Sequence, residues 1–213
     1  WIKSDLKNKK HLILLFIISL LLSIFIVKNL NVNFLLNTIL ITSAFYLFFV
    51  TSRDFFISRF KNLSQNIAHF GFSLLILSIL FNNIFSTEII TNLRIGETFA
   101  SQKFKINFET VEEKNEKNYR AIIGKFNIEY LNGEVEILKP ELRIYNQPLI
   151  VTSEADIKTT FLKDNFLVMN FVQNKEYFNI RYQIKGFMIW IWISVILLSC
   201  GGFISFFNKR YEK

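Results

Sequence analysis

The stretch that decides the fold is residues 62–87, NLSQNIAHFGFSLLILSILFNNIFST, which lies between Lys61 and Glu88 and contains no Asp, Glu, Lys or Arg. A helix needs about 20 apolar residues to cross the roughly 30 Å of hydrocarbon in a membrane. The stretch shows no strand-like alternation, and only helices and closed barrels satisfy their backbone groups in lipid. It therefore predicts a membrane-spanning helix over about residues 66–84.

Three other stretches of the chain also lack charged side chains. They lie between Lys10 and Lys28, between Lys28 and Arg53, and between Lys185 and Lys209. Each is close to the length that a spanning helix requires, although the first is short and relies on Lys28 extending outward to the interface. The sequence thus predicts four spans in all, and the three added here cover about residues 11–29, 34–51 and 186–207.

The segment between the third and fourth spans has a different character and reads as strands. It alternates apolar and polar residues, and Asn132-Gly133 predicts a hairpin with a type I′ turn. One part, Thr152–Thr160, reads instead as a short helix capped by Thr152 or Ser153. The predicted strands are Lys103–Thr110, Phe126–Tyr130, Glu134–Leu138, Leu142–Tyr145, Phe166–Phe171 and Phe178–Ile184.

The expected fold class is therefore an integral membrane α-helical protein with an inserted, extracytoplasmic, all-β domain, either a small sandwich or a barrel. Residues 1–87 would hold three spans and an amphipathic cytoplasmic loop at 52–65, in which Arg53–Asn62 forms an interfacial helix. Residues 88–185 would form the β domain. Residues 186–213 would form the fourth span and a basic tail.

The formal net charge of +8 fixes the expected orientation, because its excess lies beside the spans. Residues 88–185 carry equal numbers of basic and acidic side chains, and the loop after the first span has only Lys28. By the positive-inside rule, both termini and the 52–65 loop are cytoplasmic and the β domain faces outward. The basic residues therefore set topology, and nucleic-acid binding is not expected. These residues are Lys3, Lys7, Lys9, Lys10, Arg53, Arg59, Lys61, Lys209, Arg210 and Lys213.

Few residues of the chain could carry chemistry. The single cysteine, Cys200, lies within the fourth span and is interpreted as a packing residue. The interpretation favoured for His11 is a polar residue at the inner mouth of the first span. His69 is a stronger candidate, because an ionisable residue inside a span usually faces a partner, a cavity or a ligand. A neutral imidazole there could ligate heme iron, with Gly71 admitting a flat macrocycle, or it could bond a neighbouring helix.

Several short motifs, taken in order, give the chain a resemblance to the CcmF and NrfE proteins of cytochrome c biogenesis, the heme lyase component. The resemblance covers nearly the whole chain, as the last four spans of a longer protein. The motifs are Ala68-His69-Phe70-Gly71, Asn118-Tyr119-x-Ala121, Pro140-Glu141-x-Arg143-x-Tyr145, Thr152-Ser153-Glu154-Ala155-Asp156-Ile157, Trp190-Ile191-Trp192, Gly201-Gly202 and Lys209-Arg210. Because the chain begins at Trp1 rather than Met, we expect a further portion of the same protein upstream.

The resemblance implies a function and a set of partners. The complete protein would take heme from a heme chaperone and attach it to apocytochrome c, together with thiol-handling assembly factors. It implies that His69 is an axial ligand of a b-type heme, whose other histidine lies upstream, and that the catalytic site is incomplete in this chain. Glu141, Arg143 and Tyr145 would either dock a partner or form a structural turn, which is the interpretation favoured here. The expected location is the bacterial inner membrane with the β domain in the periplasm, or else the mitochondrial inner membrane.

Two other classes of function remain open on the sequence alone. The first is a membrane-anchored scaffold or sensor whose outer β domain binds a partner protein without a cofactor. The second, a transporter fragment, is ranked last because only scattered Ser, Thr and Asn residues could line its spans.

Overall fold

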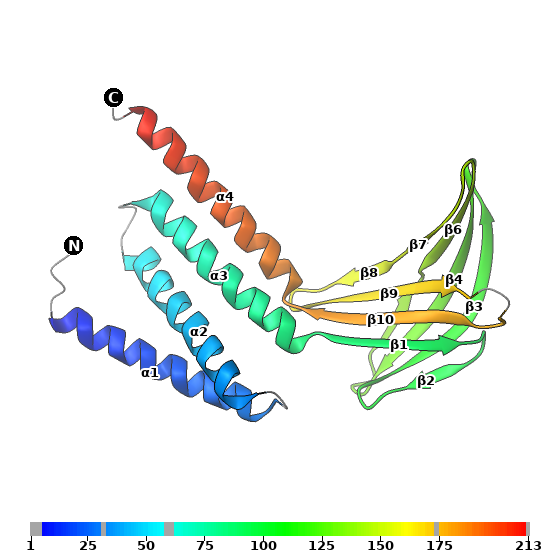
Figure 1. Ribbon diagram of the computed structural model, residues 1–213, viewed down its shortest axis with the longest axis horizontal. Coiled ribbons are helices and arrows are strands. Elements are labelled where there is room, and N and C mark those ends of the chain that lie inside the picture. Colours follow the sequence, from blue (N-terminus) through cyan, green and yellow to red (C-terminus); the bar gives the residue numbers. More distant parts are fainter. Residues whose placement is uncertain (1–5, 31–32, 58–61, 173–174, 212–213) are drawn as a thin grey trace. The chain divides into compact units, whose positions relative to one another are not determined.

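The structure is a computed structural model that describes residues 6–30, 33–57, 62–172 and 175–211. The chain divides into two compact units (Figure 1). The helical unit comprises Trp1–Ile84 and Phe187–Lys213, and the β unit comprises Phe85–Gly186. The β unit is therefore an insertion between two helices, as the charge pattern predicts.

Four helices of the helical unit are long and apolar enough to cross a membrane: α1 (Leu6–Lys28), α2 (Phe34–Ile57), α3 (Leu63–Phe85) and α4 (Met188–Tyr211). The four predicted spans are thus confirmed as helices. α2 continues past residue 51, the predicted end of the second span, through Arg53 to Ile57. Long basic side chains can reach the interface from a helix end, so a charge does not stop the helix there. The rest of the predicted interfacial helix includes residues 58–61, which lie outside the described residues.

Hydroxyl groups and aromatic rings join the first three helices. Ser23 Oγ on α1 lies 2.6 Å from Thr42 Oγ1 on α2, and Thr51 Oγ1 on α2 lies 2.6 Å from Ser73 Oγ on α3. The ring of Phe70 on α3 packs against the ring of Phe55 on α2 at 5.4 Å between centroids. Lipid offers no hydrophobic gain for helix association, so such bonds and close packing hold spanning helices together.

Two glycines bring α3 and α4 into close contact. A Cβ atom placed on Gly201 of α4 would lie 2.7 Å from the backbone nitrogen of Ala68 on α3. A Cβ placed on Gly71 of α3 would lie 2.9 Å from the backbone nitrogen of Leu198 on α4. Small residues let helix backbones approach in this way, and these two positions have no room for a side chain.

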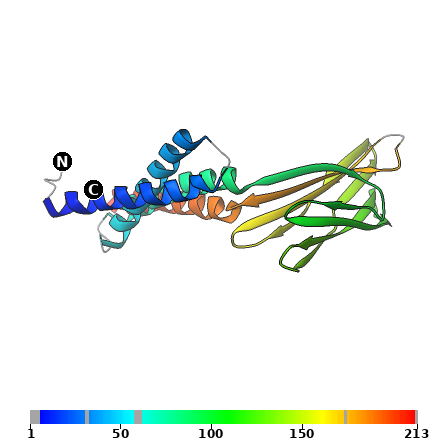
Figure 2. The same cartoon turned by 90° about the horizontal axis from the view of Figure 1, so that it is seen from below.

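The β unit contains two antiparallel sheets (Figure 2). One sheet has the order β1-β10-β9-β8, and the other has the order β2-β3-β4-β6-β7 with β5 paired to β4. Their inner faces share one apolar core, which includes Phe104, Phe108, Phe126, Leu167 and Ile180. The strands are β1 (Thr87–Leu93), β2 (Thr98–Ala100), β3 (Phe104–Asn115), β4 (Tyr119–Tyr130), β5 (Val135–Leu138), β6 (Glu141–Asn146), β7 (Leu149–Glu154), β8 (Asp156–Thr159), β9 (Lys163–Phe171) and β10 (Phe178–Gly186).

The hairpin between β4 and β5 is confirmed, but its turn type differs from the prediction. Gly133 has φ of +83°, whereas Asn132 is not among the residues with positive φ. The backbone N–H of Gly133 donates to the carbonyl of Tyr130, and Tyr130 N–H donates to the Glu134 carbonyl. This is a three-residue loop with glycine in the left-handed region, rather than a type I′ turn, which needs positive φ at both central residues.

The predicted helix at Thr152–Thr160 is wrong. The segment forms the second half of β7 and all of β8, which belong to different sheets. Thr152 and Ser153, taken in the sequence as caps, lie in the β6–β7 ladder, where Ser153 Oγ donates to Asn170 Oδ1 at 2.5 Å. Adjacent Thr and Ser residues fit a helix N-cap and an edge strand equally well. A helix would also need apolar residues at helical spacing after the cap, and this segment has no such stripe.

A buried polar cluster lies at one end of the sandwich. Glu136 Oε2 accepts hydrogen bonds from Tyr130 Oη at 2.7 Å and from Asn165 Nδ2 at 2.6 Å, and Tyr130 Oη lies 2.8 Å from Tyr182 Oη. Glu136 is 5% exposed. Burial raises the pKa of Tyr182 to about 12, so its hydroxyl keeps its proton at neutral pH.

We expect Glu136→Ala to destabilise the β unit by about 1–3 kcal/mol, because it removes the buried carboxylate that accepts hydrogen bonds from the Tyr130 hydroxyl and the Asn165 amide. Urea unfolding of a fragment spanning residues 85–186 measures this. The ends of that fragment are paired, Thr87 opposite Ile184, so the fragment can close on itself. Glu134→Ala is the matched control, because Glu134 is exposed. Equal stability of the two variants would contradict a structural role for the buried carboxylate.

Candidate functional site

His69 lies on a side of α3 that the other described helices leave uncovered. Phe70 and Ser73 face α2, while Ala68 and Gly71 face α4. His69 falls between these two directions and is exposed, as is Phe72 on the same side of the helix. Within the described parts of the chain, the His69 imidazole has no hydrogen bond or ion pair. A partner for this imidazole would have to approach the uncovered side of α3.

Gly71 does not have the role that was expected from the sequence. It was interpreted as the residue that admits a flat macrocycle beside His69, but its Cα faces α4, where a Cβ would meet Leu198 N and Ser194 O. The reason is helical geometry, since residues two apart point to different sides of a helix. Gly71 therefore serves helix packing, and the space beside His69 is not made by it.

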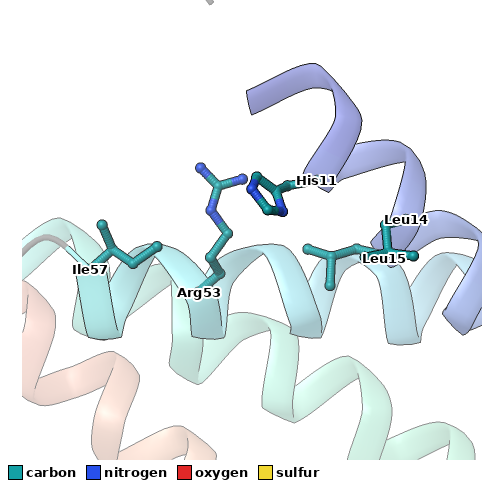
Figure 3. Close-up of a pocket in the computed structure, with 5 residues that line it drawn as sticks. All are labelled: His11, Leu14, Leu15, Arg53 and Ile57. Atoms are coloured by element: carbon teal, nitrogen blue, oxygen red, sulfur yellow. The ribbon is translucent and has the colours of Figure 1, made fainter. Parts of the chain in front are cut away.

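The second histidine lies in a different place. His11 lines a pocket between α1 and α2 together with Arg53, and its ring is directed toward the guanidinium (Figure 3). His69 is not among the described residues that line this pocket. The structure therefore gives no support to His11 and His69 as two ligands of one group.

The lone cysteine is also placed differently from its interpretation. Cys200 is exposed on α4 rather than buried among packed side chains. The neighbouring Gly201 makes the contact with α3, so the adjacent residue faces another direction.

Glu141, Arg143 and Tyr145 alternate along β6 and share one face of the sheet. Arg143 Nε lies 3.0 Å from Glu141 Oε2, and the Arg143 guanidinium lies 5.1 Å from the centre of the Tyr119 ring. The Tyr119 and Tyr145 rings are 5.3 Å apart. The predicted contact between Glu141 and Arg143 is present, but it belongs to a strand and is half-buried, so the interpretation as a buried turn is wrong. The charge of Arg143 is already engaged, and its pKa is raised by the hydrogen bond with Glu141.

Three sequence motifs that lie apart in the chain become neighbours in this sheet. Tyr119 on β4 is opposite Tyr145 on β6, and Ala121 is opposite Arg143. Arg143 is in turn opposite Thr152 on β7. Opposite residues of an antiparallel pair share a face, so the motifs form one continuous surface.

The comparisons with known proteins agree with this architecture. Residues 84–186 match the protein family described as the CcmF C-terminal beta-sandwich. The β unit thus resembles the CcmF C-terminal β-sandwich in sequence. The described β unit, Phe85–Gly186, coincides with the matched segment almost to the residue.

Sequence similarity to CcmF extends beyond the β-sandwich segment. Over 169 residues, the chain is 27% identical to cytochrome c-type biogenesis protein CcmF of Haemophilus influenzae, covering 76% of this chain and 26% of the relative. It is 30% identical to cytochrome c-type biogenesis protein ccl1 of Rhodobacter capsulatus, covering 59% of this chain and 19% of the relative. NrfE of the same Haemophilus species is 24% identical, covering 82% of this chain and 28% of the relative. The chain thus spans about a quarter of the length of these relatives, or less.

A solved structure shares the fold of both units. The chain of "Cytochrome c Heme Lyase CcmF" superposes with a TM-score of 0.67 at 17% identity, covering 94% of this chain and 34% of that chain. At this identity the likeness shows the fold, which includes the helices as well as the β-sandwich.

Sequence reasoning missed the buried cluster around Glu136. Its members come from β4, β5, β9 and β10, and in the sequence each looks like a polar residue within a strand. The only signal was that Asn165, like Tyr182, falls on the inward side of an alternating run. Nothing in the sequence indicates that these inward positions meet one another.

Proposed function

We propose that this chain is the C-terminal part of a heme lyase in cytochrome c maturation, and that it helps to bind heme and attach it to apocytochrome c. The observation that carries the proposal is the CcmF C-terminal β-sandwich, inserted between two spanning helices. Relatives that share this sequence are named for cytochrome c-type biogenesis. The alternative of a scaffold without a cofactor has no such support.

In this proposal His69 is one axial ligand of a b-type heme. Its fit rests on an exposed imidazole within a span, on the side of α3 that α2 and α4 leave open. The bound heme would carry electrons that keep the transferred heme reduced. The chain's own contribution is to hold the imidazole in apolar surroundings, beside Phe72, and to leave room for the other ligand. That ligand would be a histidine of the upstream portion of the protein.

The outer face of β6 is the proposed docking surface for the heme chaperone or apocytochrome c. Glu141, Arg143 and Tyr145 lie on it, half-buried, with Tyr119 beside them. Because Arg143 is engaged by Glu141 and Tyr119, this face offers an aromatic and polar surface of fixed shape rather than an unpaired charge. Such a surface suits a partner that packs on tyrosine rings.

The proposed location is the bacterial inner membrane, with the β unit in the periplasm. Ten Lys and Arg residues flank the spans on one side, against Lys28 alone in the short loop of the other side. We expect a reporter inserted at residue 132 to be translocated, and reporters at residue 58 and after residue 213 to remain cytoplasmic. Fusions to alkaline phosphatase and to a fluorescent protein measure this. A cytoplasmic signal from a reporter at residue 132 would contradict the proposed orientation.

A domain deletion tests the proposed function. The two ends of the β unit are adjacent, Thr87 opposite Ile184, so a short linker between α3 and α4 can replace residues 87–186. We expect cells that carry this form of the full-length protein to lose covalent holocytochrome c, as seen by heme staining of denaturing gels. Cells that carry the unaltered protein are the control. Undiminished holocytochrome c, with the shortened protein present in the membrane, would refute a role of the β unit in maturation.

A further inference from the structure

The pocket between α1 and α2 combines two basic side chains with apolar walls. It has a volume of about 550 Å³ and its described lining consists of His11, Leu14 and Leu15 from α1 and Arg53 and Ile57 from α2. The His11 ring and the Arg53 guanidinium point toward each other across the gap (Figure 3). Two hydrogen-bond donors of basic character that converge in this way form a site for an anion.

The charge of Arg53 is only weakly compensated within the described residues. Its ion-pair partner is Asp54, with Arg53 Nε and Asp54 Oδ1 3.8 Å apart and the Asp54 side chain 55% exposed. An ion pair this long and this exposed contributes little, so a better-placed anion can compete with it. The planar guanidinium is suited to phosphate, to which it can donate two parallel hydrogen bonds.

The position along the helices indicates what carries the anion. His11 is the second residue of the apolar span that begins at Lys10, and Arg53 lies one turn before the end of α2. Leu14 and Leu15 continue the lining by one turn into the span. The ligand therefore needs an anionic head at the end of the span and an apolar part beyond it, and basic pockets between spanning helices take lipid head groups of this kind.

We propose that this pocket binds the phosphate of an acidic phospholipid, with His11 and Arg53 as donors and the leucines in contact with the first carbons of an acyl chain. The site is separate from His69, which does not line the pocket. The bound lipid would contact both α1 and α2 at the ends of these helices that lie opposite the loop joining them. It would therefore hold these two helix ends together.

Native mass spectrometry of the purified chain in detergent, titrated with phosphatidylglycerol or phosphatidylcholine, tests the proposal. We expect phosphatidylglycerol to be retained in preference, and Arg53→Gln and His11→Gln each to weaken its binding about fivefold, since one basic group near a membrane surface contributes about that factor. Arg53→Lys should keep most of the binding. Lys10→Gln is the matched control, because Lys10 is exposed at the same end of α1 and is not part of the described lining.

The outcomes separate a lipid from its alternatives. Inorganic phosphate at millimolar concentration should leave the bound phosphatidylglycerol in place, and its displacement would assign a free-anion site instead. Equal retention of phosphatidylcholine would show an apolar groove without anion recognition, and equal loss in Arg53→Gln and Lys10→Gln would show general charge attraction. Either result overturns the proposal. Circular dichroism of each variant confirms that the helices are retained.

Discussion

His69→Ala in the full-length protein should abolish the absorbance of a six-coordinate, bis-histidine b-type heme. The imidazole is the proposed ligand, and it is exposed on the side of α3 that α2 and α4 leave uncovered. Loss of a residue that merely orients a metal ligand costs about 10–100-fold in affinity, so loss of the ligand itself should cost at least that much. The measurement is the reduced-minus-oxidised spectrum of purified protein, with heme content per protein from the pyridine hemochrome.

His11→Ala is the matched control for this experiment. Both substitutions remove one of the two histidines of the chain from near the end of a span. His11 faces Arg53, so its loss should leave the heme spectrum intact. The chain of residues 1–213 alone should bind heme weakly or not at all, since only one proposed ligand lies within it. An unchanged heme spectrum in His69→Ala would show that His69 is structural and would contradict its assignment as a heme ligand.

Gly201→Ala should strongly destabilise the helical unit, whereas Gly202→Ala should not. A Cβ on Gly201 would meet the backbone nitrogen of Ala68 at 2.7 Å and the carbonyl oxygen of Ser64 at 2.9 Å, so α3 and α4 would have to move apart. Overpacking of this kind costs about 1–3 kcal/mol, and backbone atoms cannot turn away as a flexible side chain can. A Cβ on Gly202 meets nothing within 4 Å, and alanine favours the helix by up to about 1 kcal/mol.

The pair of variants is measured by heating the detergent-solubilised full-length protein and following the fraction that remains monodisperse on size exclusion. The midpoint of Gly201→Ala should fall well below that of the unaltered protein, while Gly202→Ala should match or exceed it. If both variants behave alike, the close approach of α3 and α4 at Gly201 does not limit stability.

The helical unit was largely predictable, because one strong signal defines it. Long uncharged stretches can only be spans in a chain of this composition, and four of them appear as α1 to α4. The ends were less certain, as α2 shows by continuing past Arg53 to Ile57. What the sequence could not supply was the direction in which each residue faces. Gly71 and Cys200 were both assigned to the wrong side of their helices for this reason.

The β unit was predictable in class and less so in detail. Its alternating runs predicted six of the ten strands. β1 and β2 were not predicted, and Thr87–Leu93 follows the span directly without a turn signal. β7 and β8 were missed because Thr152–Thr160 was interpreted as a helix. The pairing between strands distant in the sequence could not be predicted either. The cluster of Tyr130, Glu136, Asn165 and Tyr182 forms only when β4, β5, β9 and β10 come together. Local patterns do not encode such contacts.

The ladder that aligns β4, β6 and β7 has an evolutionary consequence. Ala121, Arg143 and Thr152 stand side by side across three strands, although up to 31 positions separate them along the chain. A bulkier residue at 121 would displace the guanidinium from its place over the Tyr119 ring, and a change at 143 would alter the space available at 152. Substitutions at these three positions should therefore be accepted in combination rather than singly, and they should covary as a group among homologous chains.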